Sequence, residues 1–395
     1  MTGLDVNNHR ARIATAGLFL TNGALFANLL PRYPEIKADL GLSNTAFGLA
    51  VAAFSAGALL SGPAAAALIR RFRSSVVAVA GSVLIAVFTV TAGLAPTGAT
   101  LAAALFCAGA ADSVTDVAQN LHGLRVQRNY GRFIINSLHA VWSSGAMLGG
   151  LMGAGAIYLG IPRAVQLSVS GLLFSAVCLI GYRFLLPGPD HDEPDRHRDG
   201  GGIPRPGRAV YLVLAALVAI AIAGAVIEDA GSSWATLYLH TSLAAPAAIA
   251  ALGYVAVVGF QFLGRLFGDR MVDRFGQRAV ARAGGLIIAL GMGAALALPS
   301  VPGTIAGFAA AGFGSATLVP AAMHAADELP GLRPGTGLTA LTWLMRMGFL
   351  ASPIVVGAIA DAASLRVGLL TVPVAGLAAL LLARVLSART RTVRS

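Results

Sequence analysis

Four acidic residues of this chain lie inside long apolar stretches: Asp112, Asp116, Glu228 and Asp229. A charge at the centre of a bilayer costs about 2.5–3.5 kcal/mol on insertion scales, so acids in such stretches are candidates for function. Burial in a low dielectric disfavours the ionised carboxylate, which can then gain and lose a proton as its access to water changes. These residues therefore predict a membrane protein that handles protons or polar solutes.

The first two acids belong to a regular polar stripe. Asp112, Asp116 and Asn120 are spaced four residues apart, so on a helix all three project from one face. Lipid would leave these groups unsatisfied, so the stripe is expected to face a bundle interior or a water-filled cavity. The alternative is a structural role, in which a buried arginine or hydrogen bonds hold the acids permanently.

The second pair of acids is adjacent in sequence, and neighbours on a helix point about 100° apart. We therefore expect one of them in the cavity, with a slight preference for Glu228, while Asp229 joins helices. Trp234 follows in the same stretch, and its ring suits stacking on a solute as well as anchoring at the membrane interface.

Three basic side chains complete the polar set. Arg346 lies near the middle of an apolar run and needs an acid, so it either pairs structurally or holds substrate. His139 titrates near physiological pH and serves either as a proton relay or as a hydrogen-bonded link between helices. Arg265 lies closer to the end of its run, where snorkelling to water is the simpler expectation.

Apolar runs position these residues and recur along the whole chain. The hydrophobic share is 56%, charged residues make up 11%, and the mean hydropathy is +0.76, whereas a soluble domain carries about 25% charged residues. About twelve runs are long enough to cross a hydrocarbon core as helices. Their richness in Gly and Ala weighs against a β-barrel. They lie near 13–31, 44–68, 75–95, 99–122, 134–159, 165–186, 210–238, 245–268, 279–299, 303–324, 337–360 and 366–388.

The net charge of +11 reflects membrane topology rather than nucleic-acid binding. Arginines gather in alternate short loops, so the positive-inside rule places both termini in the cytoplasm. Between two blocks of apolar runs lies a segment rich in Pro, Gly and charge. We therefore expect bundles at 1–186 and 210–395 and a cytoplasmic linker at 187–209. His191 and His197 in the linker lack metal-site spacing, so no metal or cofactor is expected.

Residues in the two blocks match at a single offset, which indicates an internal repeat. The pairs are Phe72 with Phe275, Gly109 with Gly312, and Gly145 with Gly348, since 275 − 72, 312 − 109 and 348 − 145 all equal 203. Zinc-helix, nucleophile-elbow and phosphate-loop motifs are not found, so we do not expect an enzyme.

One loop of each half carries a recognisable pattern, G-x-L-x-D-R-x-G-R-R. The second half has Asp273, Arg274, Gly276 and Arg278, whereas the first keeps Arg71 and has Arg73 in place of the glycine. On these residues the chain resembles the major facilitator superfamily of secondary transporters. The resemblance implies an all-α membrane protein of twelve transmembrane helices, arranged as two pseudo-symmetric six-helix bundles around a central site. Asp273, Arg274 and Arg278 then either gate that site or only anchor the loop and set topology.

Further motifs resemble the fucose permease-like branch and its uncharacterised bacterial relatives. They are Asp112-x-x-x-Asp116-x-x-x-Asn120, Gly131-Arg132, His139-x-x-Trp142 and Glu228-Asp229. This resemblance implies proton symport of a small polar solute such as a sugar. The architecture of the family places helices one, four, seven and ten around the cavity, which admits Asn22, Asn28, Asn120 and Trp234.

Together these patterns predict a proton-coupled secondary active transporter that works by alternating access in the bacterial cytoplasmic (inner) membrane. It is expected to be a monomer whose partners are a small-molecule substrate, protons and the lipid bilayer. The expected proton-coupling residues are Asp112, Asp116, Glu228, Asp229 and His139, and the expected substrate ligands are Asn22, Asn28, Asn120, Trp234 and Arg346.

Two other functions stay open. The first is a proton-driven antiporter that exports drugs or metabolites. Gly149-Gly150 of the antiporter signature is present, but the Gly-Pro that should precede it is absent, which weakens this interpretation. The second is a membrane sensor that does not transport.

Overall fold

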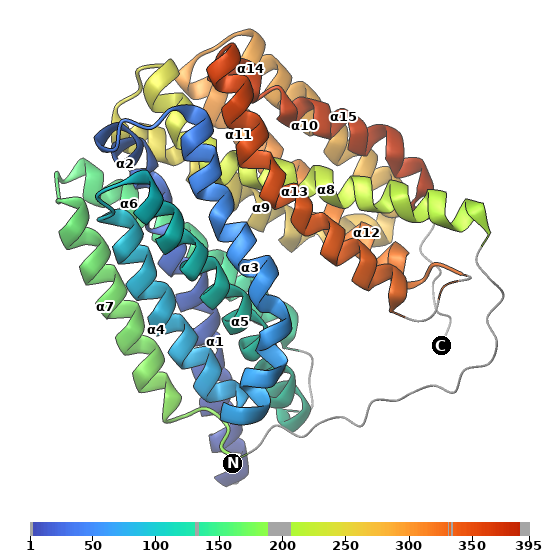
Figure 1. Ribbon diagram of the computed structural model, residues 1–395. Helices are drawn as coiled ribbons and strands as arrows, with labels where there is room; N and C mark the ends of the chain where they lie inside the picture. Colours follow the sequence, from blue (N-terminus) through green and yellow to red (C-terminus); the bar gives the residue numbers. More distant parts are fainter. Residues whose placement is uncertain (1–2, 131–133, 189–206, 331, 333–334, 388–395) are drawn as a thin grey trace. The chain divides into compact units, whose positions relative to one another are not determined.

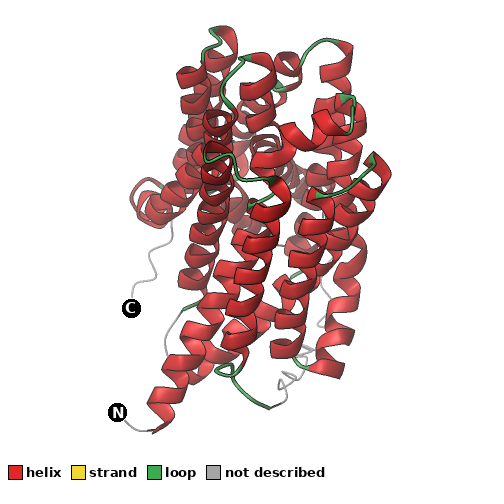
Figure 2. Ribbon diagram, turned by 90° about the vertical axis from the view of Figure 1, so that its left-hand side faces the viewer, coloured by secondary structure: helices red, strands yellow, loops and turns green. Residues whose placement is uncertain are grey.

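The structure is a computed structural model of the chain and describes residues 3–130, 134–188, 207–330, 332 and 335–387 (Figure 1). Every regular element within these residues is a helix (Figure 2). Twelve helical segments are long and apolar enough to cross a membrane, by length and composition. They confirm the all-α fold class and overlap all twelve predicted spans.

The chain forms two compact units. The first comprises Met1–Asp192 with Pro246–Val255, and the second comprises Glu193–Ala245 with Ala256–Ser395. The helices of the first half of the chain are α1 (Gly3–Ala27), η1 (Leu30–Arg32), α2 (Tyr33–Asp39), α3 (Asn44–Phe72), α4 (Ser74–Gly93), α5 (Gly98–Tyr130), α6 (Ile135–Tyr158) and α7 (Arg163–Tyr182). Within this half, α1 packs on α6, and α5 packs on both α3 and α4.

The second half repeats this pattern with more interruptions. Its helices are α8 (Arg208–Leu237), the π-helical η2 (Tyr238–Ser242), α9 (Ala247–Phe275), α10 (Gln277–Ala297), α11 (Val301–Ser315), α12 (Leu318–Asp327), α13 (Thr336–Ala362), α14 (Leu365–Gly368), α15 (Thr371–Leu382) and η3 (Ala383–Val385). Here α8 packs on α13 as α1 packs on α6, and α10 packs on α15 as α4 packs on α7.

Local chemistry fixes several helix ends. Ser43 begins α3 by accepting a hydrogen bond from the Ala46 backbone N–H, and Ser300 begins α11 in the same way from Gly303. Such caps satisfy donors that have no partner inside the helix. Helix α1 ends at Ala27, and four residues later Pro31 lies in the first turn of η1. Proline lacks the N–H that a continuous helix needs.

The structure confirms the repeat at the offset of 203. Helices α3 and α9 both have 29 residues, and their bounds differ by 247 − 44 = 203 and 275 − 72 = 203. The residue after each helix has a positive φ, +74° at Arg73 and +82° at Gly276, and 276 − 73 = 203. The first half therefore holds an arginine in the backbone conformation for which the second half uses glycine.

Two equivalent glycines bring helix backbones into contact. A Cβ on Gly109 would lie 1.9 Å from the carbonyl oxygen of Phe54, and one on Gly312 would lie 2.1 Å from that of Val257. These contacts join α5 to α3 and α11 to α9, and 257 − 54 = 203. Small residues at such positions allow close helix packing in a bilayer. The third pair differs, because Gly145 meets the Leu20 carbonyl oxygen closely whereas a Cβ on Gly348 would have 3.2 Å to its nearest neighbour.

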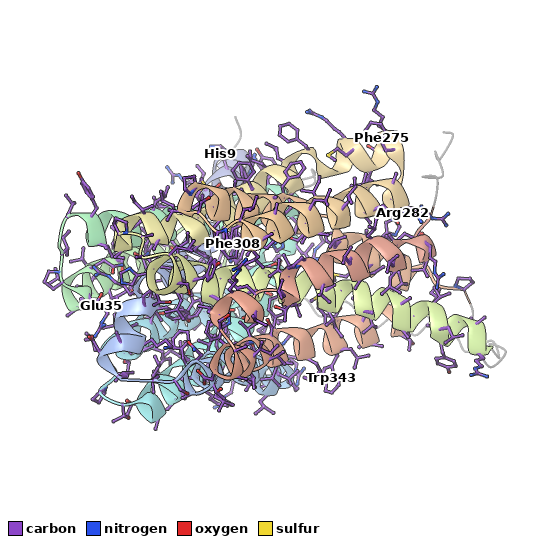
Figure 3. The ribbon with its side chains drawn as sticks, turned by 90° about the horizontal axis from the view of Figure 1, so that it is seen from above. His9, Glu35, Phe275, Arg282, Phe308 and Trp343 are labelled. Atoms are coloured by element: carbon purple, nitrogen blue, oxygen red, sulfur yellow. The ribbon has the colours of Figure 1, made fainter. Side chains whose placement is uncertain are left out.

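Large apolar side chains cover much of the outside of the helices. Leu60, Leu172 and Leu290 are 70%, 73% and 64% exposed. Figure 3 shows Phe308 among the helices, where it is buried, and Phe275 and Trp343 at the outside. An outer surface of this kind suits lipid rather than water.

Two side chains near the end of α5 form hydrogen bonds with the backbone that follows α7. The Leu186 N–H donates to His122 Nε2 over 3.3 Å, and Arg125 donates to the carbonyl oxygens of Pro187 and Gly188. The predicted linker follows, but most of it, with His191 and His197, lies outside the described residues. The Gly131-Arg132 motif also lies outside them.

Candidate functional site

Asp112 takes part in a hydrogen-bonded group drawn from three helices of the first unit. Asn22 of α1 donates from Nδ2 to Asp112 Oδ1 of α5 over 2.9 Å. Trp142 of α6 donates from Nε1 to Asn22 Oδ1 over 2.7 Å. The Asn22 amide thus uses both ends, one toward the indole and one toward the acid, and Asn22 is only 5% exposed. The structure places a carboxylate, an amide and an indole together inside the bundle.

Asp116 lies one helical turn further along α5 and has its own partners. Asn120 Nδ2 donates to Asp116 Oδ1 over 2.9 Å, which confirms that these two side chains share a face. His139 Nε2 of α6 lies 3.1 Å from Asn120 Oδ1. Because an amide oxygen only accepts, His139 Nε2 carries the hydrogen in this contact. An amide does not take up a proton near neutral pH, so Asn120 orients the imidazole and the acid without passing a proton between them.

Asn28 lies in a different network. Its side chain is fully buried, and Gln166 of α7 donates to Asn28 Oδ1 over 2.9 Å. Arg32 Nε in turn donates to Gln166 Oε1 over 3.0 Å, and Arg32 pairs with Glu35 over the same distance. These bonds connect the segment between α1 and α2 to α7. The structure therefore does not bring Asn28 into the group around Asp112.

The adjacent acids of α8 have different surroundings, as the angle between helical neighbours requires. Asp229 is 8% exposed and accepts a hydrogen bond from Ser233 over 3.1 Å. Glu228 is 29% exposed, and Gln261 Nε2 of α9 donates to Glu228 Oε2 over 2.9 Å. Glu228 is thus the more accessible of the two carboxylates.

The pairing of Arg265 with Glu228 was not predicted from the sequence. Its NH2 atom lies 3.9 Å from Glu228 Oε2. The Arg265 side chain is therefore within ion-pair distance of an acid on α8, and it is also 40% exposed. The available signal was the four-residue spacing of Gln261 and Arg265, which puts both on one face of an apolar helix.

The remaining predicted residues lie on α8, α9, α10 and α13. Trp234 of α8 is fully buried, and Arg346 of α13 is half-buried. Asp273 and Arg274 are exposed at the end of α9, where the Arg274 guanidinium stacks 5.4 Å from the Phe275 ring centroid. Arg278 donates from Nε to the carbonyl oxygen of Leu386 over 2.9 Å. Among the described residues, no salt bridge joins Asp273 to a cation.

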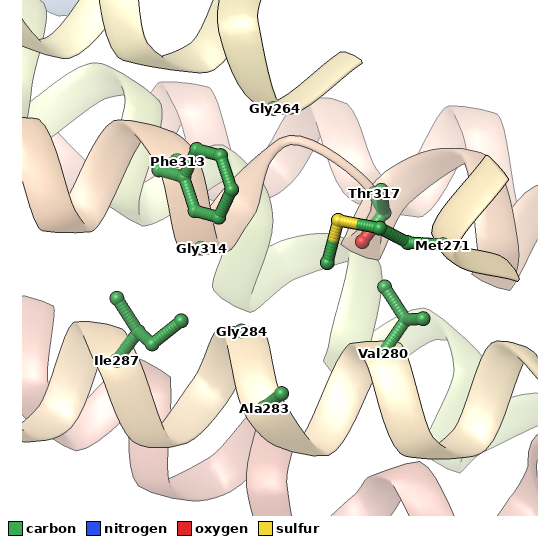
Figure 4. A pocket seen from close by; sticks show the side chains of 9 residues that line it. All are labelled: Gly264, Met271, Val280, Ala283, Gly284, Ile287, Phe313, Gly314 and Thr317. Atoms are coloured by element: carbon green, nitrogen blue, oxygen red, sulfur yellow. The ribbon is translucent and has the colours of Figure 1, made fainter. Parts of the chain in front are cut away.

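A pocket in the second unit is apolar. It lies between α9, α10 and the junction of α11 with α12 (Figure 4). Glycines 264, 284 and 314 form part of its wall, and the other lining side chains are apolar except Thr317. A site for a polar solute needs several convergent polar groups. The polar groups are instead found around Asp112 and Asp116 in the first unit and around Glu228 in the second, and each is a candidate site within its own unit.

Comparison with known proteins agrees with this arrangement of helices. The family model described as Major Facilitator Superfamily matches residues 15–271. The chain belongs to the major facilitator superfamily. An uncharacterised transporter of Sinorhizobium fredii is 30% identical over 374 residues, covering 92% of this chain and 96% of the relative. This major facilitator protein is therefore a multi-pass membrane transporter rather than an enzyme.

Solved structures of other major facilitator transporters share its fold. The nucleoside transporter NupG aligns with a TM-score of 0.70 at 12% identity, covering 97% of this chain and 98% of that one. A D-xylose–proton symporter aligns with a TM-score of 0.69 at 14% identity, covering 98% of both chains. At these identities the likeness concerns the fold alone. The signature loops predicted the family and an all-α fold of twelve apolar helices. Both predictions are confirmed.

Proposed function

We propose that this transporter couples the movement of a small polar solute, such as a sugar, to protons, and that it works by alternating access. The observation that carries the proposal is the contact of Asp112 with Asn22 and of Asn22 with Trp142. Carboxylates and amides suit the hydroxyl groups of a polar solute, and an aromatic ring offers a surface on which it can stack. A carboxylate inside a membrane helix also supplies a site for a proton.

The cellular setting belongs to the same proposal. Both termini lie in the cytoplasm and the protein acts as a monomer in the bacterial cytoplasmic membrane. The distribution of arginines between alternate loops supports this orientation. Asp273, Arg274 and Arg278 gate the pathway from their positions at the turn between α9 and α10.

Two of the structural neighbours are named after solutes that are rich in hydroxyl groups. One neighbour is a nucleoside transporter and another is a proton symporter for D-xylose. Those names describe the neighbours. They guide the choice of compounds for a first binding screen of this chain.

The test begins with purified protein and a thermal-stability screen of sugars, nucleosides, amino acids and drugs, since a ligand that binds the folded state raises its apparent stability. The compound that stabilises most is then used in proteoliposomes. Asp112→Asn keeps the size of the side chain but cannot exchange a proton. It should abolish accumulation driven by a proton gradient while counterflow exchange continues.

The matched control is Asp39→Asn, which removes an acid that pairs with Arg163 and is 56% exposed. It should leave gradient-driven uptake unchanged. Adding the solute to sealed cells should make the medium more alkaline, because protons enter with it. Gradient-driven uptake that survives Asp112→Asn would refute the role of Asp112. Proton release from loaded vesicles would show that the protein exports its solute instead of taking it up.

A further inference from the structure

Arg265, Glu228 and Gln261 form a second polar group, distinct from the one around Asp112. The Arg265 side chain is 40% exposed, and its separation from Glu228, 3.9 Å, is longer than a hydrogen bond. Gln261 lies one turn away on α9 and supplies the close hydrogen bond to the same carboxylate oxygen at 2.9 Å. Glu228 thus lies near the positive charge of Arg265 but accepts no hydrogen bond from the N–H groups of its guanidinium.

A guanidinium presents five N–H donors in a planar fork that matches a carboxylate with two parallel hydrogen bonds. Arg265 makes no such bond to Glu228. Within the part of the chain that the structure describes, no other carboxylate lies within 4.0 Å of Arg265. The donors of this half-exposed side chain are therefore available to a carboxylate from solution.

The internal repeat shows that the fold itself does not need these polar residues. Subtracting the offset, 261 − 203 = 58 and 265 − 203 = 62, so Ala58 and Gly62 hold the equivalent positions on α3. The first half therefore builds the same helix with two small residues. An amide and a guanidinium placed one turn apart in the second half call for a role beyond packing, because each is costly in a membrane helix.

We propose that Arg265 binds the carboxylate of an anionic solute and that protonation of Glu228 makes this position available. While Glu228 is ionised, its negative charge opposes a second anion beside Arg265. Once Glu228 takes up a proton, Arg265 keeps its full charge and accepts the solute carboxylate. One proton and one monoanion then bind together with no net charge. This inference rests on the proposed proton coupling and requires that the polar solute carry a carboxylate, so a sugar acid would fit it and a neutral sugar would not.

Other charged groups on the elements around α8 are the same in the wild type and in a Glu228→Gln variant. Helices α11 and α15 contain no titratable residue within their bounds. The charged or titratable groups on these elements are Arg208, Tyr211 and Asp229 on α8, Arg346 and Asp361 on α13, His324 and Asp327 on α12, Tyr238 and His240 on η2, and Arg384 on η3. All of them remain in a Glu228→Gln variant. A pH effect that disappears in that variant therefore belongs to Glu228.

The test measures acetate binding to the purified full-length protein by thermal unfolding, against sodium chloride at equal ionic strength, at about pH 5.5 and about pH 8. The wild type should bind acetate at least about tenfold more tightly at the lower pH. Glu228→Gln should bind it equally at both values. Arg265→Gln should not bind it, and Arg265→Lys should bind it more weakly, because it keeps the charge but loses the fork.

Arg282→Gln is the matched control, since it removes an exposed arginine from α10 of the same unit (Figure 3). It should respond to acetate as the wild type does. The proposal is overturned if Arg265→Gln still binds acetate, if the pH effect persists in Glu228→Gln, or if acetate never exceeds chloride. None of these readings involves transport or Asp112, so this inference and the proposed function can fail separately.

Discussion

Replacing Arg73 by glycine should stabilise the protein. Arg73 has φ +74° and ψ 150°, close to the φ +82° and ψ 154° of Gly276 at the equivalent turn. A side chain in this backbone region costs about 1–3 kcal/mol. Glycine removes that strain but gives the unfolded chain more freedom, which offsets about 0.5–1 kcal/mol. The net gain should therefore be about 0–2.5 kcal/mol.

The assay is thermal unfolding of the wild type and variants in one detergent. Arg73→Ala removes the guanidinium and keeps a Cβ, so it separates the loss of charge from the loss of strain. Arg73→Gly should exceed Arg73→Ala in stability. The mirror change, Gly276→Ala, should lower stability by about 1–3 kcal/mol. Equal stability of the two Arg73 variants would refute the assignment of strain to this turn.

Two further predictions concern packing and buried charge. Gly109→Ala and Gly312→Ala should each destabilise by about 1–3 kcal/mol or more, since a Cβ would meet a backbone oxygen at 1.9 or 2.1 Å; unchanged unfolding temperatures would contradict both contacts. Arg32→Gln should cost about 1–3 kcal/mol, because Arg32 is buried and its loss leaves the Gln166 amide oxygen and the Ile161 carbonyl without their donor. Asp39→Asn, at the exposed end of the same network, should cost below about 1 kcal/mol in the same denaturation assay, and equal losses would argue against a buried role for Arg32.

The fold could be predicted from sequence because the bilayer leaves few alternatives. Backbone groups in lipid must bond within their own segment, so a run of about 20 apolar residues indicates a helix. The repeat was also visible, since Gly109 and Gly312 are required wherever two backbones touch. The four-residue spacing of Asp116 and Asn120 likewise predicted their contact.

The partners of the polar residues could be predicted only in part. Hydropathy gives the position of a residue along a helix, but a helix that is apolar all round gives little information about its rotation. Arg265 was therefore assigned to water by its distance from the helix end, although Glu228 lies within reach on α8. Asn28 was grouped with the cavity residues, and its place beside Gln166 depends on where α1 breaks.

The carbonyl oxygens of Phe54 and Val257 occupy the space where Gly109 and Gly312 lack a side chain. Neither helix of such a pair can turn about its own axis without a collision. A rearrangement that preserves these contacts moves α3 with α5, and α9 with α11, as rigid pairs. In such a movement the acids on α5 keep their register with α3.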